Sequence, residues 1–127
     1  LMREEKYIDS QRVFENIVAI DKKNKRAWLG LGLSQRARGN NNEALKSFLE
    51  AAVIDPTDAQ GLFEAGRIYY ETQRFEEAID QFKRVSSINP NFPRAQFYIG
   101  KTALASGNLD LAIEAAKKEQ QANPQIA

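Results

Sequence analysis

Apolar residues recur along this 127-residue chain with the spacing of amphipathic helices. In residues 7–21 the apolar positions recur every three or four residues, which is the period of one face of an α-helix. The same periodicity returns in six later segments separated by short turns rich in Asn, Asp, Gly and Pro, and no segment shows the alternation of a strand. These segments are residues 25–38, 42–54, 59–72, 75–88, 93–106 and 109–122. The pattern therefore predicts seven helices.

Cap and turn residues mark the ends of these helices. Asn24 is expected to cap the second helix, because its side-chain oxygen can accept a hydrogen bond from a free backbone N–H of the first turn. Thr57 or Asp58 is expected to do the same before residue 59. Gly39 is placed for a left-handed residue just beyond a helix end, and Pro93 suits the first position of a helix.

Several residue types return at a fixed step of 34 residues. The recurring positions are glycine at 32, 66 and 100, alanine at 44, 78 and 112, and proline at 56, 90 and 124. A fixed period over nearly the whole chain indicates an array of similar helix pairs, in which each pair packs on the next.

The first copy contains Trp28-x-x-Leu31-Gly32, Ala44-x-x-x-Phe48 and Pro56, and this skeleton resembles the tetratricopeptide repeat. The third copy departs most, since Gln96 replaces the first aromatic and Ala116 replaces the phenylalanine. The resemblance implies an all-α fold, a right-handed superhelical stack of antiparallel helix pairs with about seven helices. The expected division of this single domain is a partial repeat at 7–24 and full repeats at 25–58, 59–92 and 93–126.

The recurring small residues predict close packing of helices. A glycine inside a helix costs about 1 kcal/mol relative to alanine, so we expect the paired helix to approach closely there, with Ala44, Ala78 and Ala112 facing the glycines. Phe48 and Phe82 are expected to reach into the gap between one repeat and the next.

The two ends of the array are expected to differ from its middle. The helix at 7–21 lacks the first helix of its own repeat, so one apolar flank should be open as a candidate self-association face, formed by Tyr7, Phe14 and Ile17. In the last helix Glu119 and Gln120 replace smaller, mostly apolar residues of earlier repeats, which predicts a polar outer face and the natural end of the array. The opening at Leu1 indicates part of a longer protein.

Composition excludes several kinds of chemistry. The chain has no cysteine and no histidine, which removes disulfides, thiolates, the commonest general base and the commonest metal ligand. We therefore expect no enzymatic activity, no cofactor and no metal. A formal net charge of +1 provides no field that would attract nucleic acid, and no apolar run approaches the ~18 residues of a membrane span. Nucleic-acid binding and membrane insertion are accordingly disfavoured, and the cellular compartment is left open.

The resemblance also implies a concave groove, lined by the first helices of successive repeats, that binds peptides or partner segments. Its apolar ladder would be Leu29, Phe63 and Phe97. The remaining groove candidates are Arg26, Leu33, Arg36, Gln60, Glu64, Arg67, Tyr70, Arg94, Tyr98 and Lys101. Apolar rungs flanked mainly by cations predict a ligand with apolar anchors and acidic neighbours.

Two functions remain open from the sequence. The first is a non-catalytic scaffold or adaptor module that binds another protein in the groove. The second is structural self-assembly, in which the open flank of the first helix packs on another copy and forms a homo-oligomer. An accessory role within a larger enzyme also remains open. The carboxylate clamp of chaperone-binding members is disfavoured, because only Arg94 matches it in type.

Overall fold

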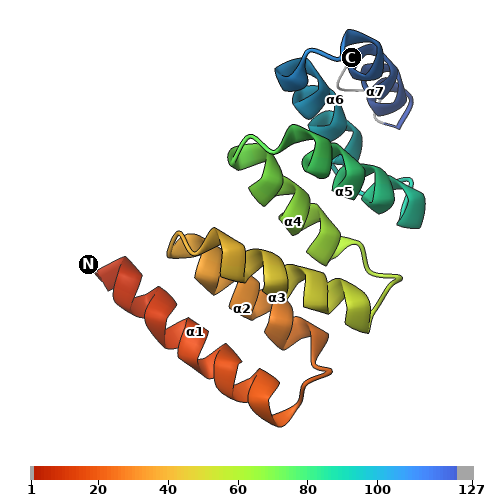
Figure 1. The fold of residues 1–127 in the computed structure, drawn as a ribbon. Helices are drawn as coiled ribbons and strands as arrows, with labels where there is room; N and C mark the ends of the chain where they lie inside the picture. The colour runs from red at the N-terminus through yellow and green to blue at the C-terminus, as the bar shows by residue number, and fades with distance from the viewer. Residues whose placement is uncertain (1, 123–127) are drawn as a thin grey trace. The chain divides into compact units, whose positions relative to one another are not determined.

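A computed structural model describes residues 2–122, which form seven α-helices joined by short turns (Figure 1). The helices are α1 (Met2–Ile20), α2 (Lys25–Ala37), α3 (Asn41–Ile54), α4 (Gln60–Glu71), α5 (Phe75–Ile88), α6 (Ala95–Ser106) and α7 (Leu109–Ala122). Six of them confirm the predicted segments to within two residues. The first begins at Met2, well before residue 7, because Glu4 and Glu5 favour a helix N-terminus without adding apolar periodicity.

The predicted cap residues perform their expected roles. The Asn24 side chain accepts a hydrogen bond from the backbone N–H of Ala27 at 3.0 Å, which confirms it as the N-cap of α2. Gly39 has φ +82°, the left-handed conformation expected just beyond the end of α2. Before α4, the Asp58 carboxylate accepts from the backbone N–H of Gln60 at 3.0 Å.

The prediction for Pro93 is wrong, because α6 begins two residues later, at Ala95. The intervening Arg94 has φ +67°, a left-handed conformation that interrupts the helical backbone. The connector before it is a turn in which the Asn89 side chain accepts from the backbone N–H of Asn91 at 3.0 Å. The connector is therefore longer than the spacing of apolar residues indicates.

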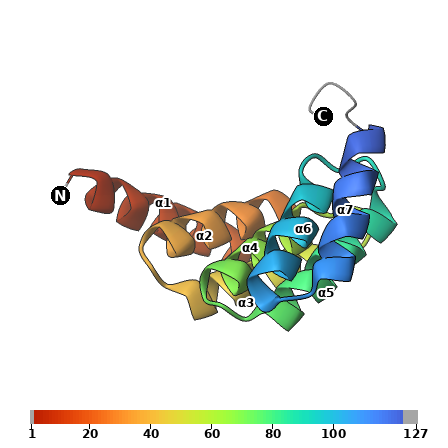
Figure 2. The ribbon, with the colours of Figure 1, turned by 90° about the horizontal axis from the view of Figure 1, so that it is seen from above.

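The chain packs as two compact units, Leu1–Ala65 and Gly66–Ala127. In the first unit α1 packs on α2 and α2 packs on α3, and in the second unit α5 packs on α6 and α6 packs on α7 (Figures 1 and 2). Short turns between helices of similar length favour this antiparallel arrangement of neighbours. Each unit is thus built from helix pairs, as the repeat pattern predicts.

The core between α1 and α2 corrects the predicted self-association face. This core consists of Val18, Ala27 and Leu31, with Phe14, Ile17 and Trp28 packed against it. Phe14 and Ile17 therefore point towards α2, and their apolar flank is not open. Tyr7 is 36% exposed, and the more exposed apolar side chains of α1 are Val13 and Ile20. Spacing alone identified one helical face correctly but assigned it to solvent instead of to α2.

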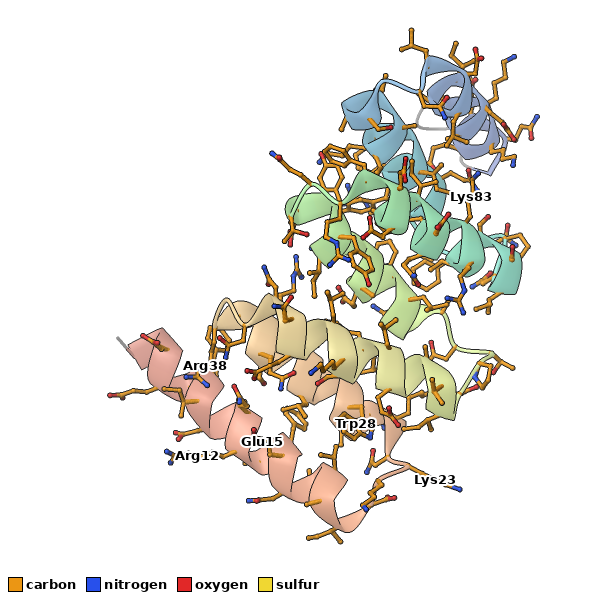
Figure 3. The ribbon with its side chains drawn as sticks, viewed as in Figure 1. Arg12, Glu15, Lys23, Trp28, Arg38 and Lys83 are labelled. Carbon is orange, nitrogen blue, oxygen red and sulfur yellow. The ribbon has the colours of Figure 1, made fainter. Side chains whose placement is uncertain are left out.

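Polar contacts also join α1 to α2 and to the turn between them. The indole N–H of Trp28 donates to the backbone oxygen of Lys22 at 2.8 Å. At the other end of α2, Arg38 donates through Nη1 to Oε1 of Gln11 at 2.8 Å, and Figure 3 shows this arginine beside α1. These bonds hold both ends of α2 against its neighbour.

The recurring glycines make room for the recurring phenylalanines. A Cβ atom placed on Gly32 would lie 2.6 Å from the Phe48 ring, and one on Gly66 would lie 2.6 Å from the Phe82 ring. The rings, and not the expected Ala44 and Ala78, provide the atoms nearest to these two glycines, whereas the backbone oxygen of Ala112 lies 3.7 Å from a Cβ placed on Gly100. Both rings are fully buried beside the glycine of their own repeat, and Phe82 also stacks on Tyr98 of the next repeat, as expected.

The outer face of α7 is polar over only part of its length. Glu119 and Gln120 lie near its end, as expected, but Leu109 and Ile113 are 63% and 55% exposed. The prediction of a polar outer face is therefore wrong for the first half of the helix. An exposed apolar face of this kind is typical of a surface that another element covers.

Candidate functional site

Two cations and three aromatic rings gather on α6 and the end of α4, within the second unit. The guanidinium carbon of Arg94 lies 4.7 Å from the ring centre of Phe97 and 5.6 Å from that of Tyr98. The Nζ atom of Lys101 lies 5.2 Å, 5.8 Å and 5.9 Å from the ring centres of Tyr70, Phe97 and Tyr98 respectively. We call these five residues the cation–aromatic cluster.

Helical spacing explains why the α6 members of the cluster meet. Phe97 and Tyr98 lie four and three residues before Lys101, so their side chains lie near it on one side of α6, while Arg94 stands just before the first turn of that helix. The Phe97 and Tyr98 rings meet edge to face, with centres 5.5 Å apart and planes at 88°. Tyr70 meets Tyr98 in the same way at 6.3 Å and 78°. Such edge-to-face contacts are a favoured geometry of aromatic pairs.

The cation–aromatic cluster has a half-buried part that packs on the core and an exposed part that faces solvent. Tyr98 is half-buried and stacks on the buried Phe82 ring, with 5.3 Å between ring centres. Phe97 is 40% exposed, and Arg94 and Lys101 are also exposed. This arrangement can bind an apolar side chain on the Phe97 ring while a carboxylate contacts either cation.

The candidates in the first unit do not form the expected exposed ladder. Leu33 is 48% exposed and Arg26 is exposed, while Leu29 is half-buried. Phe63, however, is only 8% exposed, so the prediction that it offers an apolar rung to a ligand is wrong. The physical reason is that α4 is buried at every position from Gly61 to Gly66, and helical position alone does not decide exposure.

Three further candidates of the first unit contact one another. Glu64 is only 7% exposed, and its Oε1 atom lies 3.8 Å from Nη1 of Arg36. Gln60 donates through Nε2 to the other carboxylate oxygen at 3.3 Å. A buried carboxylate needs such partners, because an unpaired charge in the interior is costly. Arg36, Gln60 and Glu64 therefore stabilise the fold of this unit.

A lysine in the basic run at residues 22–26 has a structural partner that the sequence pattern did not indicate. Nζ of Lys25 lies 2.9 Å from Oδ2 of Asp55 and 2.7 Å from Oδ2 of Asp58, in the turn that ends the same repeat. The hydrogen bonds that Lys25 donates to Asp58 and then to Asp55 raise the pKa of Lys25. The bond from Thr57, followed by that from Lys25, lowers the pKa of Asp55 to about 2.

The third repeat contains an open cavity that the sequence pattern did not indicate. It lies between α6 and α7, has a volume of about 500 Å³, and is lined by residues that include Gly100, Leu104, Ala112 and Ala116. Ala116 stands at the repeat position of Phe48 and Phe82. The missing phenylalanine is visible in the repeat pattern, but the cavity depends on how the two helices pack.

Neither metal binding nor a membrane span finds support in the part of the chain that the structure describes. Across residues 2–122, acidic side chains do not gather in groups of three that could surround a metal ion. Over the same range, no helix combines the length and the hydropathy needed to cross a bilayer.

Comparison with known families and curated proteins identifies the repeat. A family model described as "Tetratricopeptide repeat" matches residues 1–59 and 62–125. The CTR9 homolog of Arabidopsis thaliana is 27% identical over 123 residues, which cover 96% of this chain and 11% of that protein. A probable N-acetylglucosaminyltransferase, SPINDLY of Solanum lycopersicum, is 26% identical over 90 residues, or 71% of this chain and 10% of that protein. The chain thus spans about a tenth of the length of these relatives.

Solved structures share the fold at low sequence identity. A crystal structure of MamA has a TM-score of 0.86 at 24% identity, with 97% of this chain and 72% of that one covered. YrrB, described as a repeat protein with an unusual peptide-binding site, has a TM-score of 0.81 at 22% identity, with 97% and 63% covered. The Yersinia enterocolitica secretion chaperone SycD, solved with a peptide of YopD, has a TM-score of 0.68 at 22% identity, with 93% and 86% covered. These similarities confirm an all-α helical-repeat solenoid.

Proposed function

This chain belongs to the tetratricopeptide repeat family, and from that premise we propose that it is a non-catalytic scaffold module that binds a segment of another protein at the cation–aromatic cluster. The cluster carries the proposal, because it places an exposed ring between two exposed cations on one helical face. The absence of histidine and cysteine from the whole sequence supports a role in binding and not in catalysis.

The chemistry of the cluster defines the ligand. Phe97 offers an apolar contact, while Arg94 and Lys101 favour a carboxylate within reach of that contact. We therefore propose a ligand segment with an apolar or aromatic anchor next to Asp or Glu. The peptide-bound state of SycD and the peptide-binding site of YrrB support this kind of ligand for a chain of the same fold. Arg26, Leu29, Leu33 and Arg67 remain proposed contributors to the same function.

An affinity capture from host lysate tests this proposal. The baits are the wild-type chain, Arg94→Glu, and Arg84→Glu as a matched control that reverses an exposed arginine on α5. We expect one or more proteins to be retained by the wild type and the control and lost with Arg94→Glu. Equal retention by all three baits would contradict the proposal, provided that circular dichroism shows equal helicity.

A double substitution of two predicted rungs, Phe63→Glu with Phe97→Glu, would be an unsuitable test because Phe63 is buried. A glutamate there would bury a charge and unfold the first unit, which would also abolish binding. Phe97→Glu alone changes an exposed side chain of the cluster. It provides a second variant that separates loss of binding from loss of folding.

Self-association is a second candidate function, favoured by the exposed apolar residues of α1. Val13 is 55% exposed and Ile20 is 88% exposed on the same helix. Exposed apolar side chains on one helix favour burial against another molecule. Sedimentation equilibrium checks this candidate, since a mass close to the 14.4 kDa of one chain at high concentration would contradict it.

A further inference from the structure

The space beside the central glycine differs between the second and third repeats. In the second repeat the Phe82 ring lies so close to Gly66 that an added Cβ would meet it at 2.6 Å. In the third repeat a Cβ on Gly100 would meet only Ala115 Cβ at 3.5 Å and the backbone oxygen of Ala112 at 3.7 Å. The third repeat therefore keeps the glycine but lacks the ring that the glycine accommodates elsewhere.

The cavity of about 500 Å³ between α6 and α7 lies at this position. Gly100 and Leu104 line it from α6, and Ala112 and Ala116 line it from α7. Ala116 is exposed, whereas Phe48 and Phe82 at the same repeat position are fully buried. The side chain that would close this helix pair is thus absent from the chain itself.

The second unit shows what covers this face one repeat earlier. There α6 packs on α5, and its Tyr98 ring stacks on Phe82 with 5.3 Å between ring centres. In the second unit, therefore, the repeat position of Phe82 is covered by a helix that carries an aromatic ring. Leu104, which lines the cavity, is 61% exposed, and α7 carries two further exposed apolar side chains, Leu109 and Ile113.

We propose that the cavity between α6 and α7 is a docking site for an amphipathic helix of a partner protein, which inserts one aromatic side chain beside Ala116. The cavity also borders two opposite charges, Lys101 and Glu119. A partner helix that flanks its aromatic residue with one carboxylate and one cation would match them. The cavity shares Phe97 and Lys101 with the cation–aromatic cluster but is not lined by Arg94, and a helix docked between α6 and α7 goes beyond the function proposed above.

A partner protein suits the cavity better than a second copy of this chain. Among the side chains whose exposure the structure describes, only two aromatic residues are exposed, Tyr7 and Phe97. Phe97 already lines the cavity, and Tyr7 is only 36% exposed on a helix whose neighbouring residues include Glu4 and Glu5. The chain therefore offers no well-exposed ring of its own for insertion.

Two hydrocarbon-stapled, fluorescein-labelled helices serve as probes in the test. One has the sequence of residues 94–106, which includes the tyrosine that covers this face within the second unit, and the other carries Tyr98→Ala in that peptide. Fluorescence anisotropy measures both against the whole wild-type chain, Ala116→Phe, and Lys117→Phe as a control that adds the same ring to a neighbouring exposed position of α7.

We expect the tyrosine probe to bind wild type and Lys117→Phe with similar Kd. The alanine probe should bind about tenfold more weakly or worse, as is typical for loss of a buried aromatic anchor. Ala116→Phe should weaken binding of the tyrosine probe by a similar factor, because the new ring fills the cavity. The Tm of this variant should not be lowered. Arg84→Glu should leave the affinity unchanged, because this exposed residue of α5 does not line the cavity.

A second measurement does not depend on the helical probe. Titration of the 15N-labelled chain with p-cresol, the side-chain analogue of tyrosine, should shift the amide signals of Gly100, Ala112 and Ala116 in the wild type but not in Ala116→Phe. Equal binding of both helical probes, unchanged binding by Ala116→Phe, or no amide shifts at these residues would overturn the proposal. Self-association that Ala116→Phe abolishes, without probe binding, would also overturn it and assign the face to a second copy.

Discussion

The second and third repeats have the same helical skeleton but close their helix pairs differently. Around Gly66 the Phe82 ring fills the space between the helices and is fully buried. Around Gly100 the corresponding residue is Ala116, which is exposed beside a cavity. The comparison teaches that the glycine is required where the ring is present, and that one substitution converts an internal packing position into a surface open to another molecule.

The largest expected effect is the loss of the ring itself. Phe82→Ala should destabilise the protein by about 3–5 kcal/mol, because it removes a fully buried ring that stacks on Tyr98 and packs over Gly66. Urea unfolding followed by circular dichroism measures the change. A loss below about 1 kcal/mol would mean that the second repeat tolerates an open helix pair, as the third does, and the comparison would fail.

Adding a methyl group beside the ring should have a smaller effect of the same sign. Gly66→Ala should destabilise by roughly 1–3 kcal/mol, because the new Cβ would lie 2.6 Å from a Phe82 ring that has no free space to move into. This cost exceeds the gain in helix propensity, about 1 kcal/mol. Thermal unfolding of the variant should show a lower Tm, and an unchanged or higher Tm would contradict the close contact.

The same substitution one repeat later should have the opposite sign. Gly100→Ala should stabilise the protein by about 0.5–1 kcal/mol, since alanine is the better helix former and its Cβ would make only ordinary contacts at 3.5 Å and 3.7 Å. Thermal and urea unfolding measure it beside Gly66→Ala. If both variants changed stability in the same direction, the presence of the ring would not be what distinguishes the two repeats.

The smallest expected effect concerns the connectors between repeats. Asp55 and Asn89 stand at the same repeat position, and each accepts a hydrogen bond from the backbone N–H two residues later. The connector at Asp55 contains an ion pair, because Lys25 bridges Asp55 and Asp58. Any pH dependence from these turns should therefore belong to the first unit.

The direction of that pH dependence follows from the pKa shifts. The hydrogen bonds from Thr57 and Lys25 lower the pKa of Asp55 to about 2, and the bond from Lys25 lowers the pKa of Asp58. The two carboxylates therefore stabilise the folded state fully above their unfolded pKa of about 3.9, and this stabilisation is lost as the pH falls further. Because the pKa of Lys25 is raised, its contribution to the stability of the folded state is complete below a pH of about 10.4 and is lost at higher pH.

The corresponding experiment is a series of melting curves between pH 7 and pH 2. We expect Tm to fall more steeply in the wild type than in Asp55→Asn, which keeps the turn and makes this connector resemble the one at Asn89. Lys25→Met should also flatten the curve, because it removes the partner of both carboxylates. Identical slopes for all three proteins would show that the ion pairs do not contribute to stability.

Local features of the fold were predictable because they depend on residues close in sequence. The helices, the Asn24 cap and the left-handed Gly39 follow from periodicity and from backbone hydrogen bonding within a single turn. The late start of α6 was not predictable in this way, because Arg94 adopts a left-handed conformation that no residue type requires.

Part of the candidate site was also predictable. The spacing of Phe97, Tyr98 and Lys101 predicts that they lie together on a helix, and the structure confirms that Lys101 lies over both rings. Arg94 lies over the same two rings, although its left-handed backbone stands before the helix. Their assignment to a ligand remains a prediction. Phe63 failed as an exposed rung, because its exposure depends on how completely α4 is buried and not on its repeat position.

The sequence by itself determined the family, the seven helices and the 34-residue step at which glycine, alanine and proline recur, since each of these follows from a period along the chain. Only the tertiary structure decided which faces are closed. It placed Phe14 against α2, buried Phe63, paired Lys25 with two aspartates and left a cavity beside Ala116. The reason is physical: periodicity determines which side chains share a face of a helix, whereas burial and pairing depend on the elements that pack against that face.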